Sequence, residues 1–212
     1  MITEKLFNEF KESVYELADK LPQWNSKDYT RRKVSAYSSI LEELGEVSGL
    51  VSKYRVRKHY WKADTKELDN LDEIRDKFID ELADTLWVIT CSYHALNIHD
   101  DNLCLSRPEG FNSFEELKMS LNENSKQIVY YNHKELTLEA FLFTMITDAT
   151  IIIDIDSGAI LDLFFATLFR DFGHLMYAMN KEYGITIDDL MISNMNKLGK
   201  RYDKDGNRTD GK

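Results

Sequence analysis

The sequence is poor in proline, glycine and cysteine. Its 212 residues include 2 prolines and 9 glycines, too few for the many tight turns of an all-β protein. The two cysteines, Cys91 and Cys104, offer neither a disulfide framework nor metal-ligand spacing, which is typical of reduced thiols in a cytoplasmic protein. No apolar run reaches the roughly 18 uncharged residues of a membrane span, and we expect no signal peptide. The sequence therefore predicts a cytoplasmic protein without a membrane partner.

Positive charge is also scarce. The chain has 27 Lys and Arg against 37 Asp and Glu, which gives a formal net charge of −10. Proteins that bind nucleic acid without sequence preference need a basic surface, so nucleic acid is not an expected partner. The acidic balance still allows small phosphorylated ligands that are held through metal ions. The length fits one domain or two small fused halves.

Hydrophobic residues recur with a helical period in five segments. They step alternately by three and four positions, which places them along one side of a helix. These apolar seams run over residues 7–21, 37–54, 79–96, 138–152 and 161–179. Seams of this kind are typical of antiparallel helix packing. The sequence predicts an all-α antiparallel helix bundle with almost no β structure, and leaves residues 127–131 open between strand and helix.

Local signals mark the end of the bundle and a boundary within it. Gly184 is suited to end a helix, and Thr186 to cap a last helix over 187–200. The polar tail 203–212 is expected to be disordered. The stretch 98–112 is the best candidate for a loop between two halves.

Two of the expected helices carry paired carboxylates. Glu43 and Glu46 are three positions apart, as are Glu81 and Asp84, so each pair shares one helix face beside an apolar seam. Packing along the seams would bring four carboxylates together, which is unfavourable without a counter-charge. A hard cation such as Mg²⁺, or Mn²⁺ in its place, would remove the conflict and bind phosphate oxygens. Solvated helix faces in an acidic protein are the alternative. Gly45, between the acids, indicates close helix approach or ligand access.

Three segments resemble a known superfamily. Residues 41–49 read LEELGEVSG, residues 80–87 read DELADTLW, and residues 194–202 read NMNKLGKRY. They are similar to the motifs of the all-α nucleoside triphosphate pyrophosphohydrolases. These MazG-like enzymes are related to the dimeric dUTPases and to phosphoribosyl-ATP pyrophosphohydrolase. The resemblance implies a Mg²⁺-dependent attack of water on an NTP or dNTP, which gives NMP and pyrophosphate.

The resemblance also implies roles for individual residues. Metal binding and catalysis would fall to the four carboxylates, one of which would orient the water: Glu43, Glu46, Glu81 and Asp84. Contacts with phosphates or base would fall to the last segment: Asn194, Lys197, Arg201 and Tyr202. Two features depart from the family pattern. The link between the two carboxylate pairs is longer than usual, and Asp203 stands where the family has proline.

A basic stretch follows the first carboxylate pair. Residues 53–62 contain no acid. Lys53 and Arg57 fit either a solvated helix end, where cations favour the helix dipole, or contacts with a triphosphate. Trp61 fits a core position somewhat better than a base-stacking role.

The second half of the chain resembles a copy of the first. Residues 171–177 align with 81–87, so that Asp171 corresponds to Glu81 and His174 to Asp84. The counterpart of the first carboxylate pair retains only Asp148. This pattern predicts a catalytic half over 1–104, a degenerate half over 105–202 that ends in the phosphate-contact helix, and a pseudo-dimer within one chain.

Three alternatives stay open at this stage. Bundle helices look alike, so the internal similarity also fits chance. Further association into homo-oligomers through other faces is compatible with the pseudo-dimer. A non-catalytic helical interaction protein, which has kept the fold as a scaffold, is the alternative to an enzyme.

Overall fold

The computed structural model describes residues 4–60, 70–96, 114–131, 134–155, 158–203 and 205–209. The described part is almost entirely helical, which confirms the predicted all-α class. Its elements are α1 (Glu4–Ala18), α2 (Tyr29–Leu50), the π-helix η1 (Val51–Tyr60), α3 (Leu71–Ala95), α4 (Phe114–Asn124), β1 (Tyr130–Tyr131), β2 (Lys134–Glu135), α5 (Leu138–Thr150), the 3₁₀-helix η3 (Ile152–Asp154), α6 (Gly158–Tyr183) and α7 (Ile187–Arg201). Among the described helices, none combines the length and the apolar character that a membrane crossing requires.

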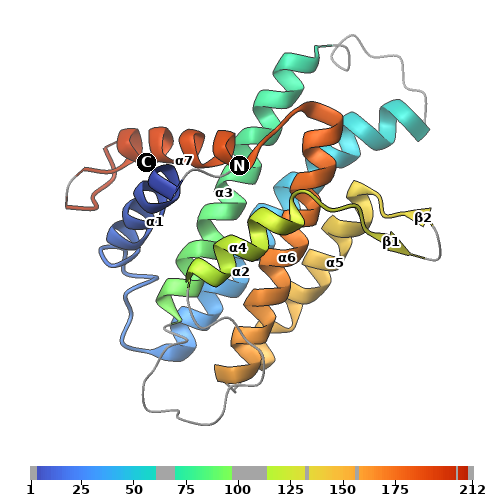
Figure 1. Ribbon diagram of the computed structural model, residues 1–212. Helices are drawn as coiled ribbons and strands as arrows, with labels where there is room; N and C mark the ends of the chain where they lie inside the picture. The colour runs from blue at the N-terminus through green and yellow to red at the C-terminus, as the bar shows by residue number, and fades with distance from the viewer. Residues whose placement is uncertain are drawn as a thin grey trace.

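Four helices form the centre of the bundle (Figure 1). α2 packs against α3, and α5 packs against α6. The two pairs meet through contacts of α2 with α5 and of α3 with α6. α4 covers α6, while α1 and α7 contact each other and both pack on α3. α7 therefore reaches the first helix pair although it follows the second in the chain.

The predicted seams are the buried sides of these helices. Leu44 and Leu82, for example, are fully buried where α2 packs on α3. The second helix pair packs on the first through aromatic contacts. The ring of Tyr93 on α3 lies edge-on to Phe165 and Phe169 of α6, at centroid distances of 5.9 and 6.5 Å. Burial of these rings provides much of the driving force that holds the two pairs together.

One aromatic residue of the second pair is not covered. Phe143 on α5 is 70 % exposed. The reason is its helical phase, because it lies off the seam that contains the buried Leu142 and Met145. It therefore points away from the other helices.

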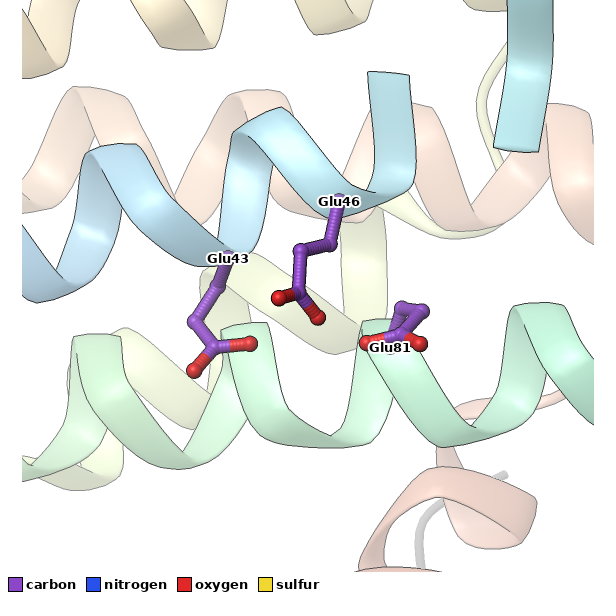
Figure 2. Close-up of side chains that lie close together, drawn as sticks. All are labelled: Glu43, Glu46 and Glu81. Atoms are coloured by element: carbon purple, nitrogen blue, oxygen red, sulfur yellow. The ribbon is translucent and has the colours of Figure 1, made fainter. Parts of the chain in front are cut away.

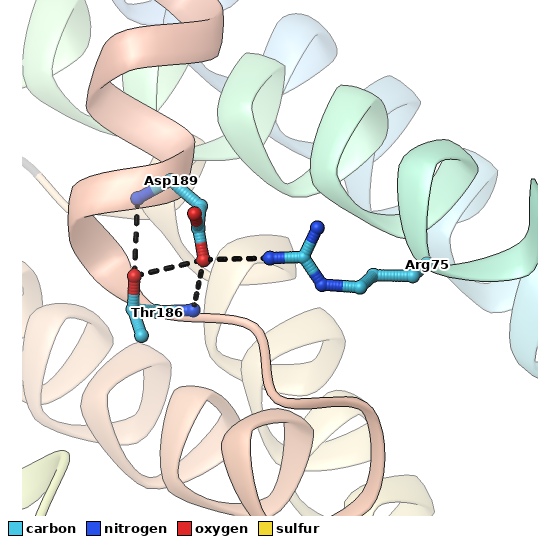
Figure 3. A network of polar contacts seen from close by, with 3 residues as sticks. All are labelled: Arg75, Thr186 and Asp189. Atoms are coloured by element: carbon cyan, nitrogen blue, oxygen red, sulfur yellow. Dashed lines mark hydrogen bonds and ion pairs between the residues drawn. The ribbon is translucent and has the colours of Figure 1, made fainter. Parts of the chain in front are cut away.

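The last helix begins with the expected cap. Thr186 and Asp189 form a capping box, and Gly184, which follows the end of α6, has a φ of 67°. Asp189 Oδ2 accepts from the Thr186 backbone N–H and hydroxyl, each at 2.8 Å, and from Arg75 Nη2 at 3.1 Å (Figure 3). Arg75 lies in the second turn of α3. The same carboxylate therefore caps α7 and links it to α3.

A π-helix extends α2. The alternating seam continues through Val51 and Tyr54, both buried, but the backbone of η1 is a ten-residue π-helix, which is rare at this length. Arg55 on η1 forms ion pairs with Glu139 on α5 and Glu182 on α6. This arginine therefore ties the extension of α2 to both helices of the second pair.

Two short segments complete the described structure. Residues 127–131, left open between strand and helix, end in β1, which pairs antiparallel with β2. In place of the expected disorder, the described part of the tail folds back on α7. The Asp203 N–H donates to the Asn207 carbonyl at 2.9 Å, and the Thr209 N–H donates to the Arg201 carbonyl at 2.8 Å. Gly206 permits this turn with a φ of 80°.

Several sequence-based expectations fall on parts that are not described. The loop over 98–112, with the boundary at 104/105 and Cys104, lies outside the described residues, as does Trp61. Cys91 is completely buried, and burial raises the pKa of its thiol. A buried, protonated thiol is unreactive.

Candidate metal centre

The packing of α2 on α3 brings three carboxylates together. Glu43 and Glu46 extend from α2 toward α3, where they meet Glu81 (Figure 2). One oxygen of each residue lies within 4.8 Å of the others. The glutamates border the buried residues Leu44 and Leu82, so the same packing that buries the seams places the acids at their edge. Convergence is therefore built into the helix pair.

Burial and mutual repulsion change the acidity of this cluster. Burial, together with repulsion from neighbouring carboxylates of which Asp84 acts most strongly, raises the pKa of Glu43 to about 8. Burial, together with repulsion from Glu46, raises the pKa of Glu81 to about 7. Without a cation, the cluster therefore retains protons near neutral pH, which is the expected response of crowded carboxylates.

The fourth predicted ligand, Asp84, has a different partner. Lys197 of α7 forms an ion pair with the Asp84 carboxylate and lies 2.9 Å from Asp80 Oδ1. The structure therefore brings three of the four predicted ligands together and binds the fourth to an ammonium group. Burial raises the pKa of Asp84, whereas Lys197 and Arg201 act to lower it. Asp84 still adjoins the cluster, because its charge acts on Glu43.

The other residues predicted on α7 are distributed along its contact with α3. Asn194 is completely buried and donates from Nδ2 to the Ala83 carbonyl at 3.3 Å. Its Oδ1 atom is buried without a hydrogen-bond partner in the described part of the chain. The charge of Arg201 acts on Asp84. Tyr202 packs partly buried against the core and pairs with Arg208 in the tail.

The basic stretch after α2 is only partly described. Lys53 lies over the ring of Tyr54, with 5.0 Å from Nζ to the ring centroid, and its charge acts on Glu73 at the beginning of α3. Glu73 is eight positions before Glu81, so the described contacts of Lys53 lie about two turns from the carboxylate cluster. The side chain of Arg57 lies outside the described residues.

Sequence reasoning did not identify Asp80. It lies one turn before Asp84 on α3, and both contact the same ammonium group. The i, i+4 spacing of the two aspartates places them on one face and is a weak signal for a shared cationic partner. Nothing in the local sequence indicates that this partner is Lys197.

The second helix pair contains a related arrangement. Burial and repulsion from Asp171 on α6 raise the pKa of Asp148 on α5, much as burial and repulsion from Glu46 on α2 raise the pKa of Glu81 on α3. His174 Nδ1 lies 4.0 Å from Asp171 Oδ1, beyond hydrogen-bond distance. Arg170 Nε also contacts Asp171 Oδ1, at 3.1 Å. The acids here are already partly neutralised by an arginine.

The carboxylate cluster fits a hard divalent cation. Ligand oxygens around Mg²⁺ lie at about 2.0–2.1 Å from the ion, so two of them are roughly 3–4 Å apart. The oxygens of the cluster, which lie within 4.8 Å of one another, are close to this spacing. Glu46 is exposed, which leaves one side open to water and ligand.

Comparisons of the chain with protein-family models, with curated proteins and with solved structures found no match.

Proposed function

We propose that this chain is a Mg²⁺-dependent nucleoside triphosphate pyrophosphohydrolase of the MazG-like kind. The observation that carries the proposal is the convergence of Glu43, Glu46 and Glu81 from two packed helices. The placement of Lys197 and Arg201 beside Asp84, which adjoins these acids, supports it, because a polyphosphate bound to the cation needs cationic partners for its remaining oxygens. Mn²⁺ is the alternative cation, and the cytoplasm is the proposed location.

The residues of the site have separate tasks in this reaction. Glu43, Glu46 and Glu81 would hold the cation, which when bound would polarise the phosphoryl oxygens and lower the pKa of a bound water. Lys197 and Arg201 bind and orient the polyphosphate. A water oxygen bonds to the α-phosphorus while the bond to the α–β bridging oxygen breaks, which gives NMP and pyrophosphate. The proton that the water loses passes to one of the carboxylates.

The second helix pair is proposed to be a degenerate copy of the first. The paired acids Asp148 and Asp171 correspond to Glu46 and Glu81 and support this view. We expect one metal ion per chain, held by the first pair. A crystal of the Mn²⁺-loaded protein would show this by anomalous scattering. A metal ion between Asp171 and His174 would overturn the idea of a degenerate copy.

The test of the activity is a substrate screen. Purified protein is incubated with Mg²⁺ and a panel of canonical and modified NTPs and dNTPs, and pyrophosphate and orthophosphate are measured separately. Release of pyrophosphate with NMP supports the proposal. Release of orthophosphate alone, or no turnover with any nucleotide, contradicts it.

A non-catalytic helical interaction protein is the second candidate. The exposed apolar residues of the α5–α6 hairpin favour it, notably Phe143 on α5 and Ile160 and Leu163 on α6, because exposed apolar side chains often mark contact surfaces. Calorimetry with Mg²⁺ separates the candidates. An interaction protein that has only kept the fold would bind no cation at the carboxylate cluster.

A further inference from the structure

Lys197 contacts Asp84, the residue that was expected to be the fourth metal ligand. Its ammonium group is in contact with Asp84 and lies 2.9 Å from Asp80 Oδ1. The side chains of Lys197 and Asp84 are only 15 % and 16 % exposed. A pair shielded from water to this extent is stronger than a surface salt bridge. Lys197 therefore holds Asp84 firmly.

Asp84 is nevertheless within reach of the cluster. It is three positions after Glu81 on α3, so the two side chains share a face. Among the neighbouring charges that act on Glu43, that of Asp84 is the largest. Asp84 is thus beside the three converged carboxylates, and its own partner is the ammonium group of Lys197.

We propose that Lys197 is a latch that keeps Asp84 out of the metal site until an anionic ligand arrives. The ammonium group and a divalent cation compete for the same carboxylate. A polyphosphate offers Lys197 a new anionic partner, so its binding releases Asp84 to become the fourth ligand. Metal and polyphosphate then strengthen each other's binding by the same factor, as thermodynamic linkage requires. This inference rests on the proposed function.

The latch differs in its consequences from a purely structural ion pair. If Lys197 only stabilised the fold, its removal would lower stability, and any gain in metal affinity from the lost positive charge would also be seen in a chain without the Asp84 carboxylate. If it is a latch, its removal frees Asp84 and increases metal affinity in the absence of nucleotide. The gain in metal affinity must also depend on Asp84, because removing Lys197 cannot free a metal ligand in a chain that lacks the Asp84 carboxylate.

The experiment measures Mn²⁺ binding without nucleotide by electron paramagnetic resonance. We expect Lys197→Met to bind Mn²⁺ about tenfold more tightly than the wild type, and Lys197→Arg, which keeps the charge, to resemble the wild type. Lys200→Met removes one charge from an exposed position of the same helix and should change the affinity little. In an Asp84→Asn background, Lys197→Met should give almost no gain.

Kinetics provide a second measurement. The loss of the phosphate contact should raise KM for the triphosphate at least tenfold in Lys197→Met, with a smaller effect on kcat. Lys197→Gln, which keeps a hydrogen-bond donor, serves if the methionine variant does not fold. Unchanged or weaker Mn²⁺ binding in the folded variant overturns the latch, as does an equal gain in the Asp84→Asn background. A wild type that binds no Mn²⁺ at all overturns the proposed function instead.

Discussion

One carboxylate oxygen of Glu46 on α2 lies within 4.8 Å of one carboxylate oxygen of Glu81 on α3. Carboxylates at this distance repel each other when both are ionised, which favours the binding of a proton. This repulsion, together with the raised pKa values of Glu43 and Glu81, makes the stability of the cation-free protein depend on pH.

The first prediction concerns that pH dependence. The folded protein keeps protons on Glu81 up to a pKa of about 7 and on Glu43 up to about 8, against 4.5 for an ordinary glutamate. Between these values the folded state binds more protons than the unfolded state, so stability falls as the pH rises. In EDTA, we expect the Tm to fall by several degrees from pH 5 to pH 8. Mg²⁺ added at pH 8 should restore it, as thermal circular dichroism would show. A Tm that stays constant over this range contradicts the crowded site.

The second prediction concerns the ligands themselves. Glu46→Gln removes one carboxylate of the cluster, and Asp84→Asn removes the carboxylate proposed to join it when a polyphosphate binds. Both changes also relieve repulsion, so each should abolish turnover and leave the helical circular dichroism signal nearly unchanged. Mg²⁺ calorimetry of Glu46→Gln and pyrophosphate release by both variants measure the effect. Glu42→Gln is the matched control, because Glu42 adjoins Glu43 in the sequence but is exposed and lies outside the cluster. Wild-type turnover in either ligand variant would refute the assignment.

The third prediction concerns Arg201, which lies one turn after Lys197 on α7. The two residues are four positions apart and share a face. Arg201→Ala should raise KM or lower kcat for the triphosphate about tenfold or more, because a charge-assisted phosphate contact is lost, and it should retain Mg²⁺ binding. The KM and kcat of Arg201→Ala are measured by steady-state kinetics and compared with those of Lys200→Ala. Unchanged kinetics would mean that the end of α7 serves packing alone.

The fourth prediction compares two helical glycines. A Cβ atom at Gly173 on α6 would lie 2.9 Å from Asn124 Cβ and 3.1 Å from the Leu121 carbonyl oxygen of α4. Gly173→Ala should therefore push α4 away and cost about 1–3 kcal/mol. Nothing lies within 4 Å of a Cβ at Gly45, so close helix approach does not explain this glycine. Gly45→Ala should stabilise the protein by up to about 1 kcal/mol.

Urea unfolding measures both glycine variants, and opposite signs are the expected outcome. Measuring the turnover of Gly45→Ala tests the other explanation for this glycine, which is ligand access. A stable variant with reduced turnover supports ligand access beside Glu46. Loss of stability in Gly45→Ala, or none in Gly173→Ala, contradicts the packing described for these helices.

The fifth prediction concerns the tie between the helix pairs. Arg55 is the common partner of Glu139 and Glu182, so Arg55→Met leaves two partly buried carboxylates facing one another. We expect a loss of about 1–3 kcal/mol in urea unfolding. Lys5→Met breaks the exposed pair with Glu9, in which the lysine side chain is 87 % exposed, and should cost less than about 0.5 kcal/mol. Equal losses would show that Arg55 does not link the pairs.

The sequence predicted the helices well because each apolar seam indicates which side of its helix is buried. The same periodicity placed Glu43, Glu46 and Glu81 beside the seams of two helices, and their convergence follows once those helices pack. Phase also explains the exposed Phe143, since it lies off the seam of Leu142 and Met145. Hydrophobic character alone does not distinguish it from its buried neighbours.

Other features depend on information that local patterns do not contain. Lys197 and Asp84 are 113 positions apart, and their pairing requires α7 to cross back over α3. The π-helix shares its buried positions Val51 and Tyr54 with the α-helical seam, so the period could not reveal it. Arg55 was overlooked because its partners belong to the other helix pair.

The chain order of the site has a consequence for synthesis on the ribosome. The acids of α2 and α3 are made first, and Lys197 follows Asp84 by 113 residues. At about 5–20 residues per second, this gap lasts roughly 6–20 seconds. For that time the nascent helix pair carries its carboxylates without the ammonium group that later binds Asp84. Solvent cations are then the available counter-charges at the proposed metal site until Lys197 is made.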